Sequence, residues 1–271
     1  MEAFYELSKS PPTHDFVNWL ARVEDERKAH GDKELAVRIV PGQRNWSERD
    51  KHYSQERREW RIDNLLIPLA WLVPSVVDAR RGTGTQTISY AQPGAPKKPF
   101  FKAPKLAKEI VSRLIPANTV AITLRNSDFD PLRNSKHNEL MWVAEWLKQK
   151  GLFPIFVPDA EADMRGLNPP IPFPIYPAAS HNFALRLALY EAAKLNLFPC
   201  DGTLAMALYS EVSLMAFGLY IPSRPCNQKD YLRAAGVSPE HDWSTPPYYK
   251  RLFWEDGTAD NIIPVLADYF K

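Results

Sequence analysis

The feature that most constrains the fold is a regular alternation of short apolar runs and amphipathic segments from about residue 105 to the C-terminus. Three apolar runs, at 119–124, 153–157 and 214–220, have the length and the β-branched or aromatic content of buried strands. The segments between them carry apolar residues at helical spacing. Because buried strands separated by helices pair in parallel, this half is predicted to be an α/β domain with a mostly parallel sheet.

The helices of this half are predicted from apolar periodicity and from residues that start or stop helices. A further strand is expected to begin at 197–198, and 251–254 precedes the last helix. The predicted helices cover 104–114, 135–150, 181–195, about 203–212 and 258–270. No internal repeat competes with this interpretation.

The first half is predicted to be a smaller α/β unit. A helix is expected from Thr13 or Asp15 to His30, followed by a strand at 34–40. A charged helix follows at 47–66, and Pro68 should end or kink it. Residues 79–102 contain glycines and several prolines and are predicted to be the longest irregular segment. We therefore divide the chain into 1–95 and 96–271.

Composition narrows the class of protein. The 34 Lys and Arg residues nearly balance 32 Asp and Glu residues, so no global field attracts nucleic acid. No run of 18 apolar residues and no secretion signal is visible, which predicts a cytoplasmic protein without a membrane span. Cys200 and Cys226 lack metal or disulfide spacing, and the six histidines are scattered, so no metal site is expected.

Two arginines follow the first predicted strand of the second half. Arg125 and Arg133 lie in the loop after 119–124, where ligands of parallel α/β sheets bind, and two guanidinium groups there suit a phosphate. Ser135 is expected to cap the next helix and to add backbone donors to the same anion. The alternative is a structural network with Asp128, Asp130 or Glu139.

A second candidate lies after the strand that begins at 197. Asp201, Gly202 and Thr203 form a strand-to-helix turn, which suits either a sugar or phosphate contact or a plain helix start. Because both turns follow parallel strands, we expect this one to lie within reach of the loop that holds Arg125. Arg186 and Tyr190, one helical turn apart, are candidates to reach a ligand edge together, or to flank the core.

Several segments resemble bacterial glycosyltransferases of the GT-B class, of the fucosyltransferase and heptosyltransferase kind. The resemblance covers most of the chain and rests on ITLRNSDFDPLRNS, FVPD, ALRLALYEAAKLNLF, THDFVNWLARVEDER, VRIVPG and WRIDNLLIPL. It implies a Rossmann-like sheet for 96–271 that binds a nucleotide sugar, and a reduced acceptor-side half at 1–95. It also implies that Arg125, at the strand end, contacts the donor diphosphate.

The resemblance implies a glycosyltransferase that needs no metal and no organic cofactor, with the nucleotide sugar as substrate. The acceptor is left open between a glycan, a lipid-linked molecule and a protein. Asp128 is our candidate for a catalytic carboxylate, with Asp15 and Asp130 as alternatives, although each also fits a cap or loop position. A non-catalytic binding module that retains the fold is the alternative function, and a phosphate hydrolase ranks last.

Overall fold

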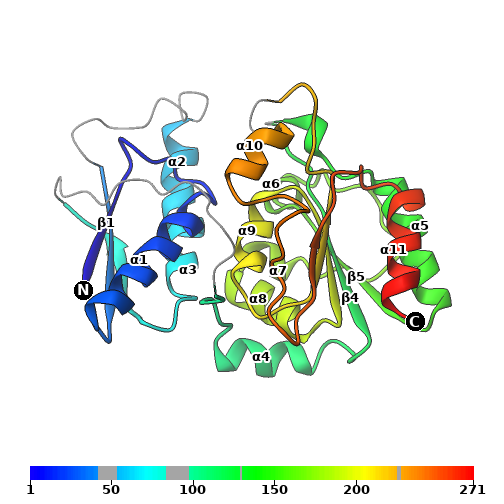
Figure 1. The fold of residues 1–271 in the computed structure, drawn as a ribbon, viewed down its shortest axis with the longest axis horizontal. Helices are drawn as coiled ribbons and strands as arrows, with labels where there is room; N and C mark the ends of the chain where they lie inside the picture. Colours follow the sequence, from blue (N-terminus) through cyan, green and yellow to red (C-terminus); the bar gives the residue numbers. More distant parts are fainter. Residues whose placement is uncertain (42–53, 84–97, 129, 225–226) are drawn as a thin grey trace.

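The computed structural model describes residues 1–41, 54–83, 98–128, 130–224 and 227–271. It contains two halves that lie side by side, each built on its own parallel sheet (Figure 1). The predicted boundary at residue 95 lies outside the described residues, as does Cys226, so the exact division stays a prediction. Of the helices in the described ranges, none has both the length and the apolar character needed to cross a membrane.

The N-terminal half has a three-stranded sheet in the order β1-β2-β3, formed by β1 (Glu2–Glu6), β2 (Leu35–Val40) and β3 (Val76–Arg81). Helix α1 (Phe16–His30) connects β1 to β2 and ends at Gly31, whose φ of 76° is left-handed. Phe16 and Trp19 of α1 pack against Tyr5 of β1 with ring centroids 4.8 and 5.2 Å away. The predicted helix to His30 and the predicted strand are thus confirmed.

Two predictions for this half need correction. The sequence interpretation missed β1 and β3, the outer strands of the sheet, and assigned residues 79–81 of β3 to the irregular segment. Outer strands are only partly covered, so their sequences mix charged and apolar residues and lack a buried run. Pro68 also does not end its helix, whereas the alternative prediction, a kink at this residue, stays a prediction. A π-helical turn (Ile62–Leu66) joins α2 (Gln55–Arg61) to α3 (Ile67–Ala70), in whose first turn Pro68 lies.

The C-terminal half has a five-stranded sheet in the order β5-β4-β6-β7-β8, and every neighbouring pair is parallel. Its strands are β4 (Thr119–Thr123), β5 (Phe153–Val157), β6 (Leu195–Pro199), β7 (Leu214–Phe217) and β8 (Lys250–Leu252). Its helices are α4 (Lys105–Ser112), α5 (His137–Gln149), α6 (Ala160–Met164), α7 (Ala178–His181), α8 (Phe183–Ala192), α9 (Gly202–Leu208), α10 (Lys229–Ala234) and α11 (Ala259–Tyr269). The predicted parallel sheet is confirmed.

Helices cover both faces of this sheet. Alternate residues of a strand point to opposite faces, so Val120 and Ile122 of β4 pack with α5 and α11 on the outer face. Ala121 joins the larger core on the other face, where α7, α8 and α9 lie between the sheet and the N-terminal half (Figure 1). This second core continues into the first half through residues such as Tyr5. The two halves therefore share one apolar interior beside the cleft described below.

Candidate functional site at a cleft between the two halves

A cleft of about 770 Å³ lies between the two halves and is lined by residues from both. The N-terminal wall comes from the start of α1 and from α2. The C-terminal wall comes from the carboxyl ends of β4, β5 and β6 and from the start of α8. A cleft of this size is within the range of small-molecule sites, and its place beyond the strand ends is the usual ligand position in parallel α/β sheets.

Arg125 emerges from the carboxyl end of β4 into the cleft. Its Nη1 donates to the carbonyl of Asp130 at 2.7 Å and to Oδ1 of Asn134 at 2.5 Å. Asn134 also accepts from the backbone N–H of Ser127, so it closes the loop around the arginine. Nε and Nη2 of Arg125 make no hydrogen bond to any residue in the described ranges. The side chain is fixed at one nitrogen and keeps donors for a ligand.

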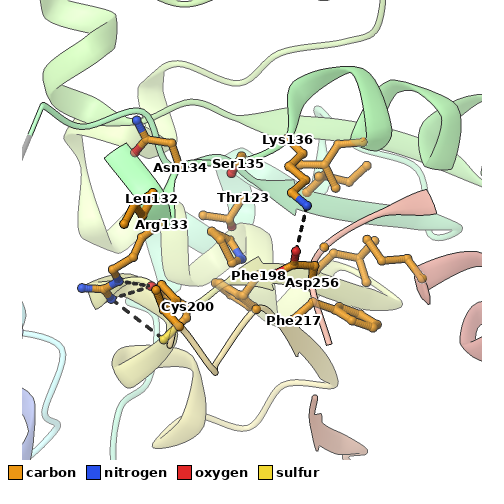
Figure 2. Close-up of a pocket in the computed structure, with 18 residues that line it drawn as sticks. Thr123, Leu132, Arg133, Asn134, Ser135, Lys136, Phe198, Cys200, Phe217 and Asp256 are labelled. Atoms are coloured by element: carbon orange, nitrogen blue, oxygen red, sulfur yellow. Dashed lines mark hydrogen bonds and ion pairs between the residues drawn. The ribbon is translucent and has the colours of Figure 1, made fainter. Parts of the chain in front are cut away.

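Arg133 brings a second cation to the same place. Its Nε donates to the carbonyl of Cys200 at 3.1 Å, which ties the loop after β4 to the end of β6 (Figure 2). Burial and the nearby Arg133 guanidinium lower the pKa of Arg125 from its ordinary value. Two arginines held close together in a partly buried site repel one another, and a bound anion would relieve that repulsion. This arrangement favours the anion interpretation.

The turn at Asp201, Gly202 and Thr203 opens α9. The Asp201 carboxylate caps the helix by accepting from the Leu204 N–H at 3.0 Å, and the Thr203 hydroxyl donates to it at 2.9 Å. Burial raises the pKa of Asp201. Because β6 pairs directly with β4, this turn and the Arg125 loop lie at the same sheet edge and both line the cleft, as predicted.

Position 202 requires glycine because the His14 side chain lies close to its Cα, a contact that the sequence did not indicate. A Cβ at this position would lie 2.1 Å from Nδ1 of His14, at the start of the N-terminal half. The space that the glycine leaves open is therefore filled by His14. Burial, together with Arg61 and Arg186, lowers the pKa of His14 to about 3, so its imidazole is neutral at ordinary pH.

Three other residues were predicted to belong to the site: Ser135, Arg186 and Tyr190. The Ser135 hydroxyl accepts from the Arg125 N–H at 2.9 Å and does not cap α5, whose N-cap is Lys136. Arg186 lines the cleft, and its Nε donates to the Ala179 carbonyl at 2.6 Å. Tyr190 is buried, with its hydroxyl 2.7 Å from that of Thr123. Their roles toward a ligand stay predictions.

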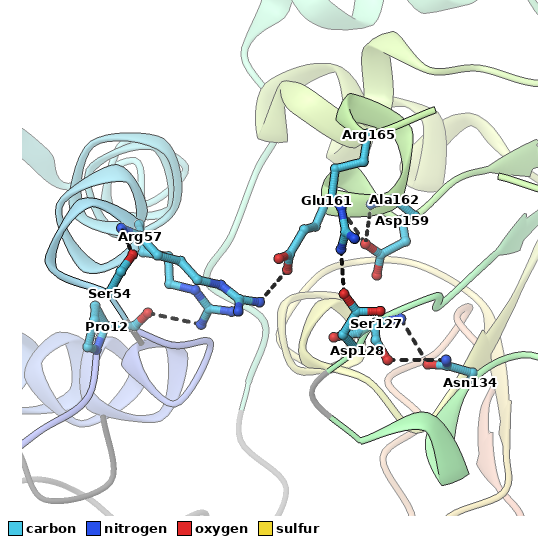
Figure 3. Close-up of polar contacts among 11 residues, drawn as sticks. Pro12, Ser54, Arg57, Ser127, Asp128, Asn134, Asp159, Glu161, Ala162 and Arg165 are labelled. Atoms are coloured by element: carbon cyan, nitrogen blue, oxygen red, sulfur yellow. Dashed lines mark hydrogen bonds and ion pairs between the residues drawn. The ribbon is translucent and has the colours of Figure 1, made fainter. Parts of the chain in front are cut away.

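Asp128 lies on an exposed loop and pairs with Arg165 (Figure 3). This hydrogen-bonded arginine lowers the pKa of Asp128. Ser127 lines the cleft next to it, whereas Asp128 itself is not among the lining residues. A catalytic role for Asp128 therefore stays an untested prediction.

The part of the N-terminal wall that α2 forms was missed by sequence reasoning. Arg57, Trp60 and Arg61 of α2 line the cleft, and Arg57 forms an ion pair across it with Glu161 of α6 (Figure 3). A charged helix was predicted here, and none of its residues was assigned to a site. The local sequence does not distinguish a helix face that is open to solvent from one that lines a cleft, because the partner of Arg57, Glu161, belongs to the other half.

A smaller cavity of about 70 Å³ lies at the same sheet edge, beside Arg133 (Figure 2). Its walls include Thr123, Phe198 and Phe217, and Lys136 pairs with Asp256 at 2.9 Å among its lining residues. In the described ranges, no three His, Cys, Asp or Glu side chains are grouped so as to hold a metal ion. The expectation of a reaction without a metal stays a prediction.

The whole chain is similar in structure to solved bacterial glycosyltransferases. Escherichia coli ADP-heptose LPS heptosyltransferase II matches with a TM-score of 0.56 and 11% identity, over 99% of this chain and 98% of that one. E. coli heptosyltransferase WaaC with ADP matches with a TM-score of 0.51 and 11% identity, over 99% of each chain. The chain has a GT-B fold.

This similarity runs through both halves, so the GT-B fold includes the small N-terminal sheet, which has three strands in the part that the structure describes. No protein-family model matches the sequence, and neither does any curated protein. At 11% identity the comparison establishes the fold, and the function must be argued from the site.

Proposed function

We propose that this GT-B protein is a glycosyltransferase that moves a sugar from a nucleotide-diphosphate donor to an acceptor without a metal ion. The observation that supports it is the inter-half cleft, in which Arg125 and Arg133 lie beside the turn that contains Asp201 and Thr203. Charge grows on the leaving diphosphate during glycosyl transfer. Guanidinium groups placed beforehand at that position would stabilise it.

The donor would bind to the C-terminal wall, with its diphosphate against Arg125. The Nε and Nη2 atoms of Arg125 are the donors left over by the loop that holds Nη1, so they define where phosphate oxygens would lie. The acceptor would then approach from the N-terminal wall, beside Trp60 and Arg61 of α2. The chemistry of the acceptor, whether glycan, lipid-linked or protein, is not assigned by these residues.

Nucleotide binding is tested by thermal shift with ADP, GDP, UDP and dTDP. ADP is the first choice because one of the similar structures is an ADP-heptose enzyme and the other holds ADP. A ligand that binds only the folded state adds about 2.7 kcal/mol of stability at a concentration of about 100 times its Kd. Arg125→Ala should remove most of that stabilisation, whereas Arg113→Ala, at the exposed end of α4, should retain it.

Two outcomes would decide against the proposal. A wild type that none of the four nucleotides stabilises would contradict a nucleotide-sugar enzyme. Nucleotide binding without release of the nucleotide from any matching nucleotide sugar would favour the non-catalytic binding module.

A further inference from the structure

A histidine and a carboxylate form a hydrogen-bonded pair on the C-terminal wall of the cleft. His181 ends α7 and lines the cleft, and its Nε2 lies 2.7 Å from Oδ2 of Asp163 in α6. The His181 side chain is 37% exposed, so it is open to a molecule in the cleft. The two residues come from separate helices, and sequence reasoning assigned neither of them to a site.

The carboxylate is held in place from its other side. Oδ1 of Asp163 accepts from Nδ2 of Asn168 at 2.9 Å, and the Asp163 N–H donates to the Asp159 carbonyl at 2.9 Å. Asp159 also caps α6 by accepting from the Glu161 and Ala162 N–H groups at 3.0 and 3.2 Å. Asp163 therefore has a fixed position and can orient the imidazole.

The hydrogen bond to Asp163 determines the tautomer of His181. An ionised carboxylate can only accept, so the proton of the neutral imidazole must lie on Nε2. Nδ1 then carries the lone pair, and no residue in the described ranges is bonded to it. A base held by a third group in this way is the arrangement that activates nucleophiles in enzymes.

The three carboxylates of the C-terminal wall have oxygens that are already engaged. Glu161 pairs with Arg57, and Asp159 and Asp201 cap helices. Asp15, at the start of α1, and Glu56, of α2, line the opposite wall of the cleft. His181 differs from Glu161, Asp159 and Asp201 because a neutral nitrogen lone pair is available without breaking an ion pair or a helix cap.

We propose that His181 is the general base of the glycosyl transfer and that Asp163 is its positioning residue, an inference that rests on the proposed function. Nδ1 of His181 takes the proton of the acceptor hydroxyl as that oxygen bonds to the anomeric carbon of the donor. The bond from the anomeric carbon to the diphosphate oxygen breaks, and its electron pair leaves with the nucleoside diphosphate. The proton remains on the imidazole and passes to solvent through the open cleft.

The test uses water as the acceptor, so it needs no knowledge of the natural one. Release of nucleoside diphosphate is measured with the nucleotide sugar that best stabilises the wild type, from a panel of ADP-, GDP-, UDP- and dTDP-sugars. His181→Ala should lower kcat by about 100-fold or more while the thermal stabilisation by nucleotide is retained. Added imidazole should restore part of the rate. His241→Ala is the matched control, because His241 also pairs with a side chain but lies outside the cleft.

Asp163→Asn separates positioning from folding. It should lower kcat with little change in KM for the donor, and it should cost little more in the His181→Ala background, because the two residues act as one unit. Full additivity of the two changes would contradict the positioning role.

A wild-type rate in His181→Ala, or a loss that imidazole does not restore, would overturn the assignment of the base. Loss of release in Asp15→Asn but not in His181→Ala would place the base on the N-terminal wall instead. A wild type that no nucleotide sugar stabilises would remove the proposed function itself, and the thermal-shift experiment on the wild type alone shows this.

Discussion

Lys250 of β8 places an ammonium group in the core, and the loss of folding stability that this burial causes can be measured directly. The side chain is 1% exposed, and Nζ donates to the carbonyls of Leu208 and Ser210 at 2.7 and 2.6 Å. Leu208 is the last residue of α9, so the lysine holds the end of the helix that begins at Asp201. Burial lowers the pKa of Lys250 from 10.5 to about 8, although Glu211 opposes this effect.

The direction of the pH effect follows from proton binding in the two states. Between pH 8 and 10.5 the unfolded chain keeps the Lys250 proton and the native state has lost it, so the free energy of unfolding rises with pH in this window. The difference between a pKa of 10.5 and one of about 8 corresponds to about 3 kcal/mol in full. The free energy of unfolding should therefore rise by about 2 kcal/mol between about pH 7 and 9.5.

The assay is urea unfolding of wild type, Lys250→Met and Lys105→Met across that pH range. Lys105 is the matched control because its side chain is 93% exposed. The wild type should gain about 2 kcal/mol relative to Lys250→Met from about pH 7 to 9.5, and it should gain nothing relative to Lys105→Met. A difference between wild type and Lys250→Met that does not change with pH would refute a buried, charged Lys250.

Three further results are expected. Arg125→Lys should weaken turnover, and Arg125→Ala should lower it by about 100- to 1,000-fold with an unchanged circular dichroism spectrum, so equal rates would remove Arg125 from the mechanism. Gly202→Ala should lower the free energy of unfolding by about 1 to 3 kcal/mol, whereas Gly257→Ala, where a Cβ would meet its nearest neighbour at 3.9 Å, should be tolerated. The pKa of about 3 for His14 means that the wild type should lose about 2 kcal/mol relative to His14→Gln when the pH falls from about 7 to 5. Parallel stability curves for those two proteins would contradict a buried neutral imidazole.

Strands β4, β5, β6 and β7 of the C-terminal sheet were predictable because nearly all of their residues are buried. All five residues of β4 are buried, so the segment appears in the sequence as a continuous apolar run. The outer strands β1 and β3 include exposed, charged positions, and for that reason the sequence interpretation missed both. The π-helical turn Ile62–Leu66, just before Pro68, likewise leaves no clear local signal.

The sequence by itself determined which residues emerge at the carboxyl edge of the second sheet. A residue that directly follows a buried parallel strand must lie there, which is why the strand pattern alone assigned Arg125 and Asp201 to one site. Tertiary structure alone decided what faces them across the cleft. His14 against Gly202, Glu161 paired with Arg57, and Asp163 bonded to His181 join separate elements, two of these pairs across the halves. Such contacts depend on how packed surfaces meet, and the local pattern of a chain carries no information about its distant partner.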